Sequence, residues 1–164
     1  MIKIKNQTCC FTGHRNIPAN EYAAIQKRLE SEIENLIRQG VRSFLAGGAL
    51  GFDTMAALTV LRLKEKYPYV QLILILPCKE QAKGWNEADK EIYGQILRQA
   101  DEAVYTSENY NKGCMHKRNR YLVEHSQVCV CYLTQATGGT AYTANYAKLQ
   151  GLLVINIADF LYNT

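Results

Sequence analysis

The feature that most constrains the fold is an alternation of short apolar segments with longer segments that have helical periodicity. The clearest apolar segment is 70–76, which has one polar residue, Gln71, and ends at Pro77. A strand that is apolar on both faces is typical of a parallel sheet with helices on either side. Because short connections join the alternating segments, the sequence predicts an α/β fold built on a parallel sheet.

We expect strands over residues 7–12, 43–46, 70–76, 103–105, 128–133 and 152–157. The first helix is predicted to be capped by Asn20 and to end at Gly40. Further helices are expected over 52–66, 87–100, 115–124 and 140–150. This pattern makes a Rossmann-like, doubly wound, mainly parallel sheet of about six strands with helices on both faces. The helix over 52–66 is too apolar for a single stripe, so we expect it to contact the sheet and another helix or a second subunit, as in a homodimer.

Length and composition indicate one domain, because 164 residues fall within the usual range of about 100–200 per domain. The longest apolar run is far short of the ~20 residues that cross a bilayer, so no membrane partner is expected. The first residues lack the apolar stretch of a secretory signal, which favours a cytoplasmic protein. The six cysteines form no CxxC pair and the three histidines are scattered, so we predict reduced thiols and no metal site.

Ligands of a doubly wound sheet bind outside the carboxyl ends of the strands, near the point where the strand order reverses. The segments that follow the predicted strands bring glycine, hydroxyl and cationic residues to this edge: 12–15, 47–53, 77–78, 112–120 and 137–140. Two of them are glycine-rich turns that open helices, where backbone N–H groups and the helix dipole favour an anion. Neither turn is a GxGxxG fingerprint or a P-loop, which argues against a common NAD dehydrogenase or nucleoside triphosphatase.

Three side chains near these turns are candidates for chemistry. Arg15 lies two residues after Gly13, where a guanidinium can hold a phosphate or carboxylate; a solvated surface arginine is the alternative. Asp53 lies in the first turn of its helix and either orders that turn or contacts a ribose hydroxyl. His14 is a candidate acid or base.

The net charge of +4 comes from one short segment. Residues 112–120 contain four Lys and Arg and no carboxylate, and in the rest of the chain Lys and Arg equal Asp and Glu in number. A solvated basic face is one reading of such a segment. Because the segment follows the fourth strand, we expect Lys117 and Arg118 to neutralise an anionic ligand and Asn119 to hydrogen-bond its sugar or base. A local patch favours a compact anionic ligand over an extended nucleic-acid track.

Several motifs carry a resemblance to a known family. Residues 46–56, which read AGGALGFDTMA, resemble the G-x-A-x-G-[IF]-D-x-x-A segment of the Rossmann domain of DNA-processing protein A (DprA). The TGHR at 12–15 and the TGGT at 137–140 match the layout of the SLOG superfamily, which joins DprA-like domains to the LOG nucleotide phosphoribohydrolases. Gln81, Trp85 and the Lys-Arg-Asn at 117–119 most resemble the single-domain, bacterial YpsA-like family. The resemblance covers about residues 9–157 and implies one SLOG-type domain over 1–164.

The resemblance implies a pocket for a nucleotide or a nucleotide-derived ligand, with no other cofactor evident. The positions that match the family motifs and are expected to bind the ligand are Gly13, Arg15, Gly47, Gly48, Gly51, Asp53, Gly138, Gly139 and Thr140. The leading hypothesis is a cytosolic binding or sensing domain for such a ligand.

Two alternatives remain open. In LOG enzymes a glutamate follows the late glycine motif, but residues 140–146 of this chain contain no carboxylate. A hydrolase of N-glycosidic bonds would have to use Asp53 in place of that glutamate, with His14 as a weaker candidate acid or base. The other alternative is DprA-like binding of single-stranded DNA by the basic segment and Tyr121.

Overall fold

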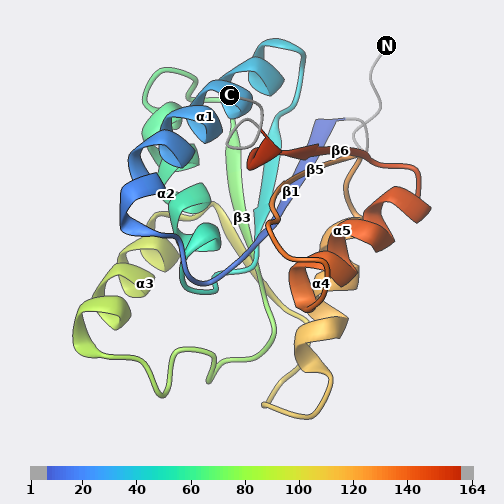
Figure 1. Cartoon of the computed structure of the whole chain (residues 1–164). Helices are drawn as coiled ribbons and strands as arrows, with labels where there is room; N and C mark the ends of the chain where they lie inside the picture. Colours follow the sequence, from blue (N-terminus) through green and yellow to red (C-terminus); the bar gives the residue numbers. More distant parts are fainter. Residues whose placement is uncertain (1–6, 160–164) are drawn as a thin grey trace.

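The computed structural model describes residues 7–159 and consists of one sheet between two layers of helices (Figure 1). All strands are parallel and follow the order β4-β3-β2-β1-β5-β6. Their bounds are β1 (Thr8–Gly13), β2 (Ser43–Ala46), β3 (Gln71–Leu76), β4 (Glu102–Tyr105), β5 (Val128–Tyr132) and β6 (Leu153–Asn156). The prediction of a six-stranded, parallel, Rossmann-like sheet is confirmed. The strand order reverses between β1 and β5.

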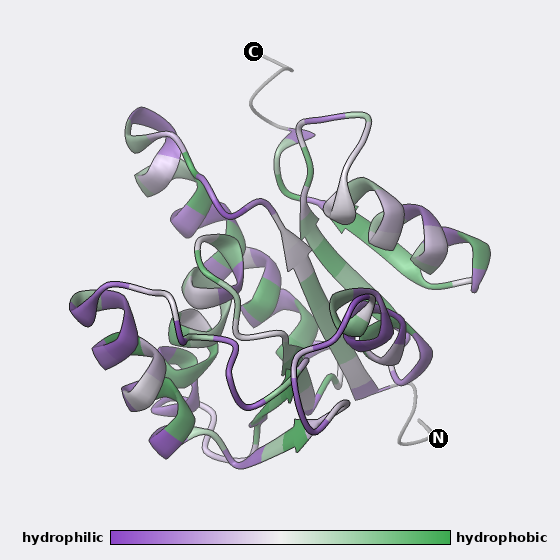
Figure 2. Ribbon diagram, turned by 90° about the horizontal axis from the view of Figure 1, so that it is seen from below, coloured by the Kyte–Doolittle hydropathy of each residue, from purple (hydrophilic) through white to green (hydrophobic). Residues whose placement is uncertain are grey.

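Helices α1 (Ala19–Arg38), α2 (Phe52–Lys64) and α3 (Glu87–Gln99) cover one face of the sheet. Helices α4 (Cys114–Glu124) and α5 (Gly139–Leu149) cover the other. Alternating residues of β1 supply the two cores, since Cys9 and Phe11 join the cluster under α1 and α2 while Cys10 joins the cluster under α4 and α5. Figure 2 shows the resulting hydrophobic strands at the centre, between helices that alternate in hydropathy.

The predicted element bounds agree with the structure to within two residues, but the expected cap of the first helix is wrong. Pro18 is the N-cap of α1, so Asn20 lies within the first turn, past the capping position. The fixed φ of proline suits a helix start, and the Glu21 N–H donates to the Pro18 carbonyl at 2.9 Å. Helix α2 ends at Lys64 rather than residue 66, because its last N–H groups close tighter turns onto Arg62 and Leu63.

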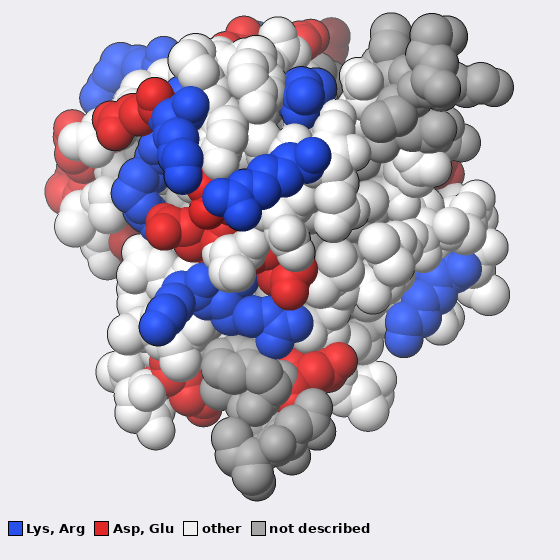
Figure 3. Space-filling view, turned by 90° about the horizontal axis from the view of Figure 1, so that it is seen from above, with Lys and Arg blue, Asp and Glu red and all other residues white. Residues whose placement is uncertain are grey.

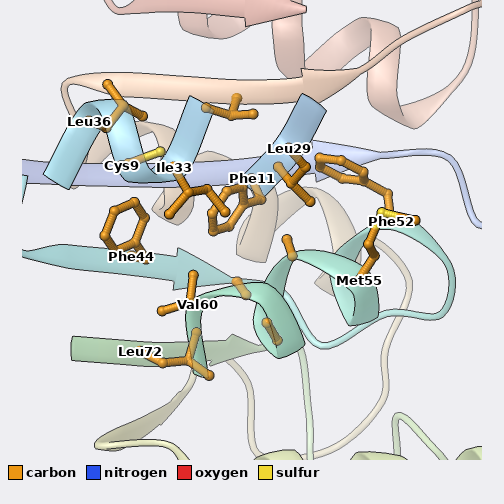
Figure 4. Packing of buried hydrophobic residues seen from close by; sticks show 14 of the residues in the cluster. Cys9, Phe11, Leu29, Ile33, Leu36, Phe44, Phe52, Met55, Val60 and Leu72 are labelled. Atoms are coloured by element: carbon orange, nitrogen blue, oxygen red, sulfur yellow. The ribbon is translucent and has the colours of Figure 1, made fainter. Parts of the chain in front are cut away.

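The apolar helix α2 is covered within this one chain. It contacts the sheet, α1 and α3, and its inward side chains meet those of α1 and the strands (Figure 4). Phe11 lies between Phe44 and Phe52, with ring centroids 6.0 Å and 6.3 Å away. The composition of α2 therefore has an explanation that needs no second subunit, and the homodimer stays a prediction.

The charges on the side of the molecule opposite to that of Figure 2 are interleaved (Figure 3). Arg62 pairs with Glu30 at 2.7 Å and Lys66 with Glu34 at 3.0 Å. Exposed pairs of this kind contribute only about 0–1 kcal/mol each to stability, so their main effect is to neutralise one another's charge. All six cysteines are buried free thiols. Within residues 7–159 no helix is long and apolar enough to cross a bilayer.

The core around Phe44 should dominate stability. Phe44→Ala should lower the free energy of unfolding by about 3–5 kcal/mol, because it removes a fully buried ring from the contact with Phe11. Urea denaturation measures the change. Leu149→Ala is the control, because Leu149 is 75% exposed and its loss should change stability by about 0.5 kcal/mol or less. Equal effects of the two substitutions would contradict this assignment of the core.

Candidate functional site

A cavity of about 290 Å³ lies at the carboxyl ends of β1 and β5, where the strand order reverses. This is the position that the topology of a doubly wound sheet favours for a ligand. Three loops and helix α4 form its walls. The lining residues are Phe11, Thr12, Gly13, His14, Arg15, Ala49, Asp53, Met115, Arg118, Asn119, Gln135, Thr137, Gly138, Gly139 and Thr140. We call this space the switch-point cavity.

The segment after β1 supplies His14 and Arg15 to the cavity. His14 Nε2 accepts a hydrogen bond of 2.9 Å from the Thr134 N–H, which ties this segment to the loop after β5. Partial burial lowers the pKa of His14, in keeping with a neutral ring that accepts at Nε2. An acid or base role for His14 stays a prediction, because this nitrogen is already engaged with the backbone. Arg15 is exposed at the cavity mouth, and its charge lowers the pKa of Asp53.

The glycines of the turn between β2 and α2 are not among the residues that line the cavity. A Cβ at Gly47 would lie 2.6 Å from Nη1 of Arg118 and 2.8 Å from Oδ2 of Asp53. Gly48 and Gly51 have positive φ, and a Cβ at Gly51 would overlap the Arg15 carbonyl group. These three glycines therefore permit close packing behind the site. They do not line the cavity, so their contact with a ligand stays a prediction.

Asp53 is a cavity residue with an unusual proton affinity. It is only 7% exposed, and its Oδ2 accepts a hydrogen bond of 3.3 Å from the Ala49 N–H. Burial raises its pKa to about 6, although Arg118, the Ala49 N–H and Arg15 oppose the rise. Its Oδ1 accepts no hydrogen bond from residues 7–159. Asp53 can thus accept a hydrogen bond from a ligand hydroxyl, or exchange a proton near neutral pH.

Arg118 brings a buried positive charge to the same wall. It is 4% exposed; Nη1 donates to the carbonyls of Gly47 and Ile75, and Nε donates to Asn119 Oδ1 at 2.8 Å. Among residues 7–159, the one hydrogen-bond partner of Nη2 is the thioether of Met115 at 3.7 Å, which is a weak acceptor. Burial lowers the pKa of Arg118, and the nearby Asp53 opposes this. A guanidinium group remains charged in proteins. Arg118 therefore gives the cavity wall a cation whose Nη2 is available to donate a stronger hydrogen bond.

The turn between β5 and α5 is open to the cavity. Gly138 caps α5 with a φ of 104°, which accounts for glycine at that position. Gly139 has no positive φ, and a Cβ there would meet no atom of residues 7–159 within 4 Å. The protein interior therefore does not require glycine at 139, and its missing side chain leaves the first turn of α5 accessible. Thr140 lies in this turn and is 9% exposed.

The sequence suggested that the basic segment, residues 112–120, acts as one patch. In the structure its residues line two different hollows. Arg118 and Asn119 line the switch-point cavity, whereas Lys117 and Arg120 line a different groove between β4, α4 and α5. Adjacent residues of a helix point about 100° apart, and the phase of α4 sends them to different sides. Met115 and Gln135 line the cavity without having been predicted. Met115 could have been found as the i−3 neighbour of Arg118, but no motif marks Gln135.

Within the described residues no group of three or more His, Cys, Asp or Glu is placed to hold a metal ion. A helix N-terminus, two arginines and one carboxylate surround the small hollow, and these groups are chemically able to bind an anion and a hydroxyl group.

The fold is a Rossmann-like α/β fold with a cavity at its topological switch point. A family model, YpsA, described as the YspA SLOG family, matches residues 9–151. The chain belongs to this family. It is 34% identical over 137 residues to the uncharacterized SPbeta prophage-derived protein YoqJ of Bacillus subtilis, covering 76% of this chain and 80% of that protein. It is 30% identical over 127 residues to the UPF0398 protein YpsA of the same organism, covering 76% and 71%.

Two solved structures share the fold. DprA of Streptococcus pneumoniae superposes with a TM-score of 0.66 at 17% identity, over 92% of this chain and 50% of that one. DprA of Helicobacter pylori, described for its single-stranded DNA binding mode, superposes with a TM-score of 0.64 at 19% identity, over 98% and 74%. The chain thus spans half the length of the Streptococcus chain, and at these identities the likeness is one of fold.

The two glycine turns should respond differently to a methyl group. Gly51→Ala should lower the free energy of unfolding by more than about 1 kcal/mol, because it strains a positive φ and collides with the Arg15 carbonyl. Gly139→Ala should leave stability unchanged or slightly higher, since the added methyl meets nothing. Urea denaturation of both variants tests this, and equal losses would contradict the geometry of the turns.

Stability should depend on the ionisation of Asp53. Its pKa of about 6 in the folded chain lies above the ordinary value of 3.8, so the folded state holds the proton more tightly than the unfolded state. The resulting stabilisation is present below about pH 4 and is lost as the pH rises to about 6. Asp53→Asn cannot ionise and should lack this loss.

The measurement is the difference in free energy of urea unfolding between Asp53→Asn and the unaltered chain, from about pH 4 to 8. This difference should move in favour of the variant up to about pH 6 and then level off. A difference that does not change with pH would show that Asp53 has an ordinary pKa.

Proposed function

We propose that the protein binds a nucleotide or nucleotide-derived ligand, with its phosphate group in the switch-point cavity. The observation that carries this proposal is the open first turn of α5 at Gly139, a position where the interior does not require glycine. Backbone N–H groups and the dipole of a helix N-terminus favour a phosphate. Arg15 and Arg118 line the same cavity and add two positive charges.

The remaining polar groups suit the sugar of such a ligand. Asp53 lines the cavity and its Oδ1 accepts no hydrogen bond from residues 7–159, and Asn119 lines the same cavity from α4. A ribose hydroxyl would donate a hydrogen bond to the carboxylate. The cavity of about 290 Å³ is at the small end of ligand sites, which favours a compact group over a nucleic-acid strand.

Hydrolysis of an N-glycosidic bond is a second candidate, favoured by the raised pKa of Asp53. A carboxyl group with a pKa near 6 can exchange a proton at working pH, as general acid–base catalysis requires. Release of free base from ribonucleoside monophosphates, lost in Asp53→Asn, would support it. Binding without turnover across the same nucleotides would restrict the function to binding or sensing.

Ligand binding should raise the melting temperature. A ligand at about 100 times its Kd adds about 2.7 kcal/mol, which corresponds to about 5 °C or more in a domain of this size. The panel comprises ribonucleoside mono- and diphosphates, ribose 5-phosphate, unphosphorylated nucleosides and inorganic phosphate. We expect the largest shift from the phosphorylated ribosides.

Variants localise the effect. Gly139→Ala and Arg15→Ala should each reduce the shift, because one covers the first turn of α5 and the other removes a cation from the cavity mouth. Lys27→Ala is the control, since it removes an exposed charge from α1. No shift with any compound, together with no small molecule in the purified protein by mass spectrometry, would overturn the proposal.

A further inference from the structure

A second hollow, of about 580 Å³, lies between the edge strand β4 and helices α4 and α5. It lies beside the edge strand of the sheet, because the main strand contacts of α4 are with β1 and β3 rather than with β4. Its lining shares no residue with that of the switch-point cavity. Four tyrosines line this hollow, so we call it the tyrosine groove: Tyr105, Tyr121, Tyr142 and Tyr146. Two cations, Lys117 and Arg120, line it as well.

The tyrosines offer aromatic surface to solvent. Tyr142 is 45% exposed and Tyr105 is 38% exposed, both large fractions for aromatic side chains. Tyr142 and Tyr146 are one turn apart on α5, with rings 8° from parallel and centroids 6.5 Å apart. Tyr121 faces the same groove from α4. Groups of exposed aromatic rings usually mark a binding surface, and flat rings suit stacking.

The charges in the groove favour an anionic partner. Lys117 and Arg120 form no ion pair with any residue in 7–159, unlike Arg62 and Lys66 on another surface of the molecule. The carboxylate in the groove, Glu124, accepts a hydrogen bond of 2.5 Å from the Tyr146 hydroxyl. The two cations are therefore available to phosphate groups beside the rings.

We propose that the tyrosine groove binds single-stranded nucleic acid, with bases stacked on its tyrosines and backbone phosphates held by Lys117 and Arg120. Aromatic platforms beside positive charges are the combination that single-strand sites use. The groove has one aliphatic residue, Val104, so it offers little to the apolar face of a protein helix. This activity goes beyond nucleotide binding in the switch-point cavity and does not depend on it.

Fluorescence anisotropy tests the proposal with a labelled thymidine strand of about 15 nucleotides, and with a duplex of the same length, at low salt. The strand should bind and the duplex should bind more weakly, because paired bases cannot stack on the rings. Tyr142→Ala should weaken strand binding by about 10-fold, whereas Tyr142→Phe should retain it. Lys117→Ala should lower the slope of log K against log salt by about 1. Tyr22→Ala, which removes an exposed tyrosine from α1, is the matched control.

The two proposals fail separately in these variants. Arg15→Ala should leave strand binding unchanged, and Tyr142→Ala should leave the nucleotide-dependent rise in melting temperature unchanged. Loss of strand binding in Arg15→Ala but not in Tyr142→Ala would place the strand in the switch-point cavity and overturn the proposal for the groove. Absence of strand binding at low salt, or equal affinity for the duplex, would also overturn it.

Discussion

The buried guanidinium of Arg118 is the constraint on which the site depends. Arg118 lies on α4, yet its Nη1 donates to the carbonyl of Gly47 after β2 and to that of Ile75 in β3. A buried cation without partners would cost several kcal/mol, so the carbonyls, Asn119 and Asp53 must all stay in place around it. Gly47 has no side chain because the guanidinium and the Asp53 carboxylate occupy that space. One interaction thus fixes α4 against the ends of two strands and shapes the wall of the cavity.

The two glycine turns look alike in the sequence but differ in what their glycines do. Close neighbours occupy the space where side chains would stand at Gly47 and Gly51, so these glycines keep the chain compact and hold Asp53 at the start of α2. Within the described part of the chain, no neighbour occupies that space at Gly139. A glycine that the interior does not require is informative. It lowers helix stability, and neither packing nor backbone conformation explains its presence. The later turn is therefore the stronger indication of a ligand, although the earlier one carries the longer family motif.

The fold could be predicted from the sequence because its signals are local. Apolar runs such as 70–76 mark buried strands, and topology alone places the segments that follow them at one edge of the sheet. The directions of neighbouring side chains could not be predicted in the same way. Whether Lys117 or Arg118 turns toward the cavity depends on the rotational phase of α4, which is set by packing against β1, β3 and α5. The pKa of Asp53 is likewise a consequence of burial among distant segments.

The division of the basic segment also changes what the net charge means. Counted along the chain, Lys117, Arg118 and Arg120 form one patch, and a patch of that size suits a compact anion. In the folded chain Arg118 is buried beside Asp53, while Lys117 and Arg120 lie in a groove among exposed tyrosines. Charge alone attracts any phosphate to either place. We expect the surroundings of each charge to discriminate, because a carboxylate and an open helix turn suit a small phosphorylated sugar, whereas flat rings suit unpaired bases.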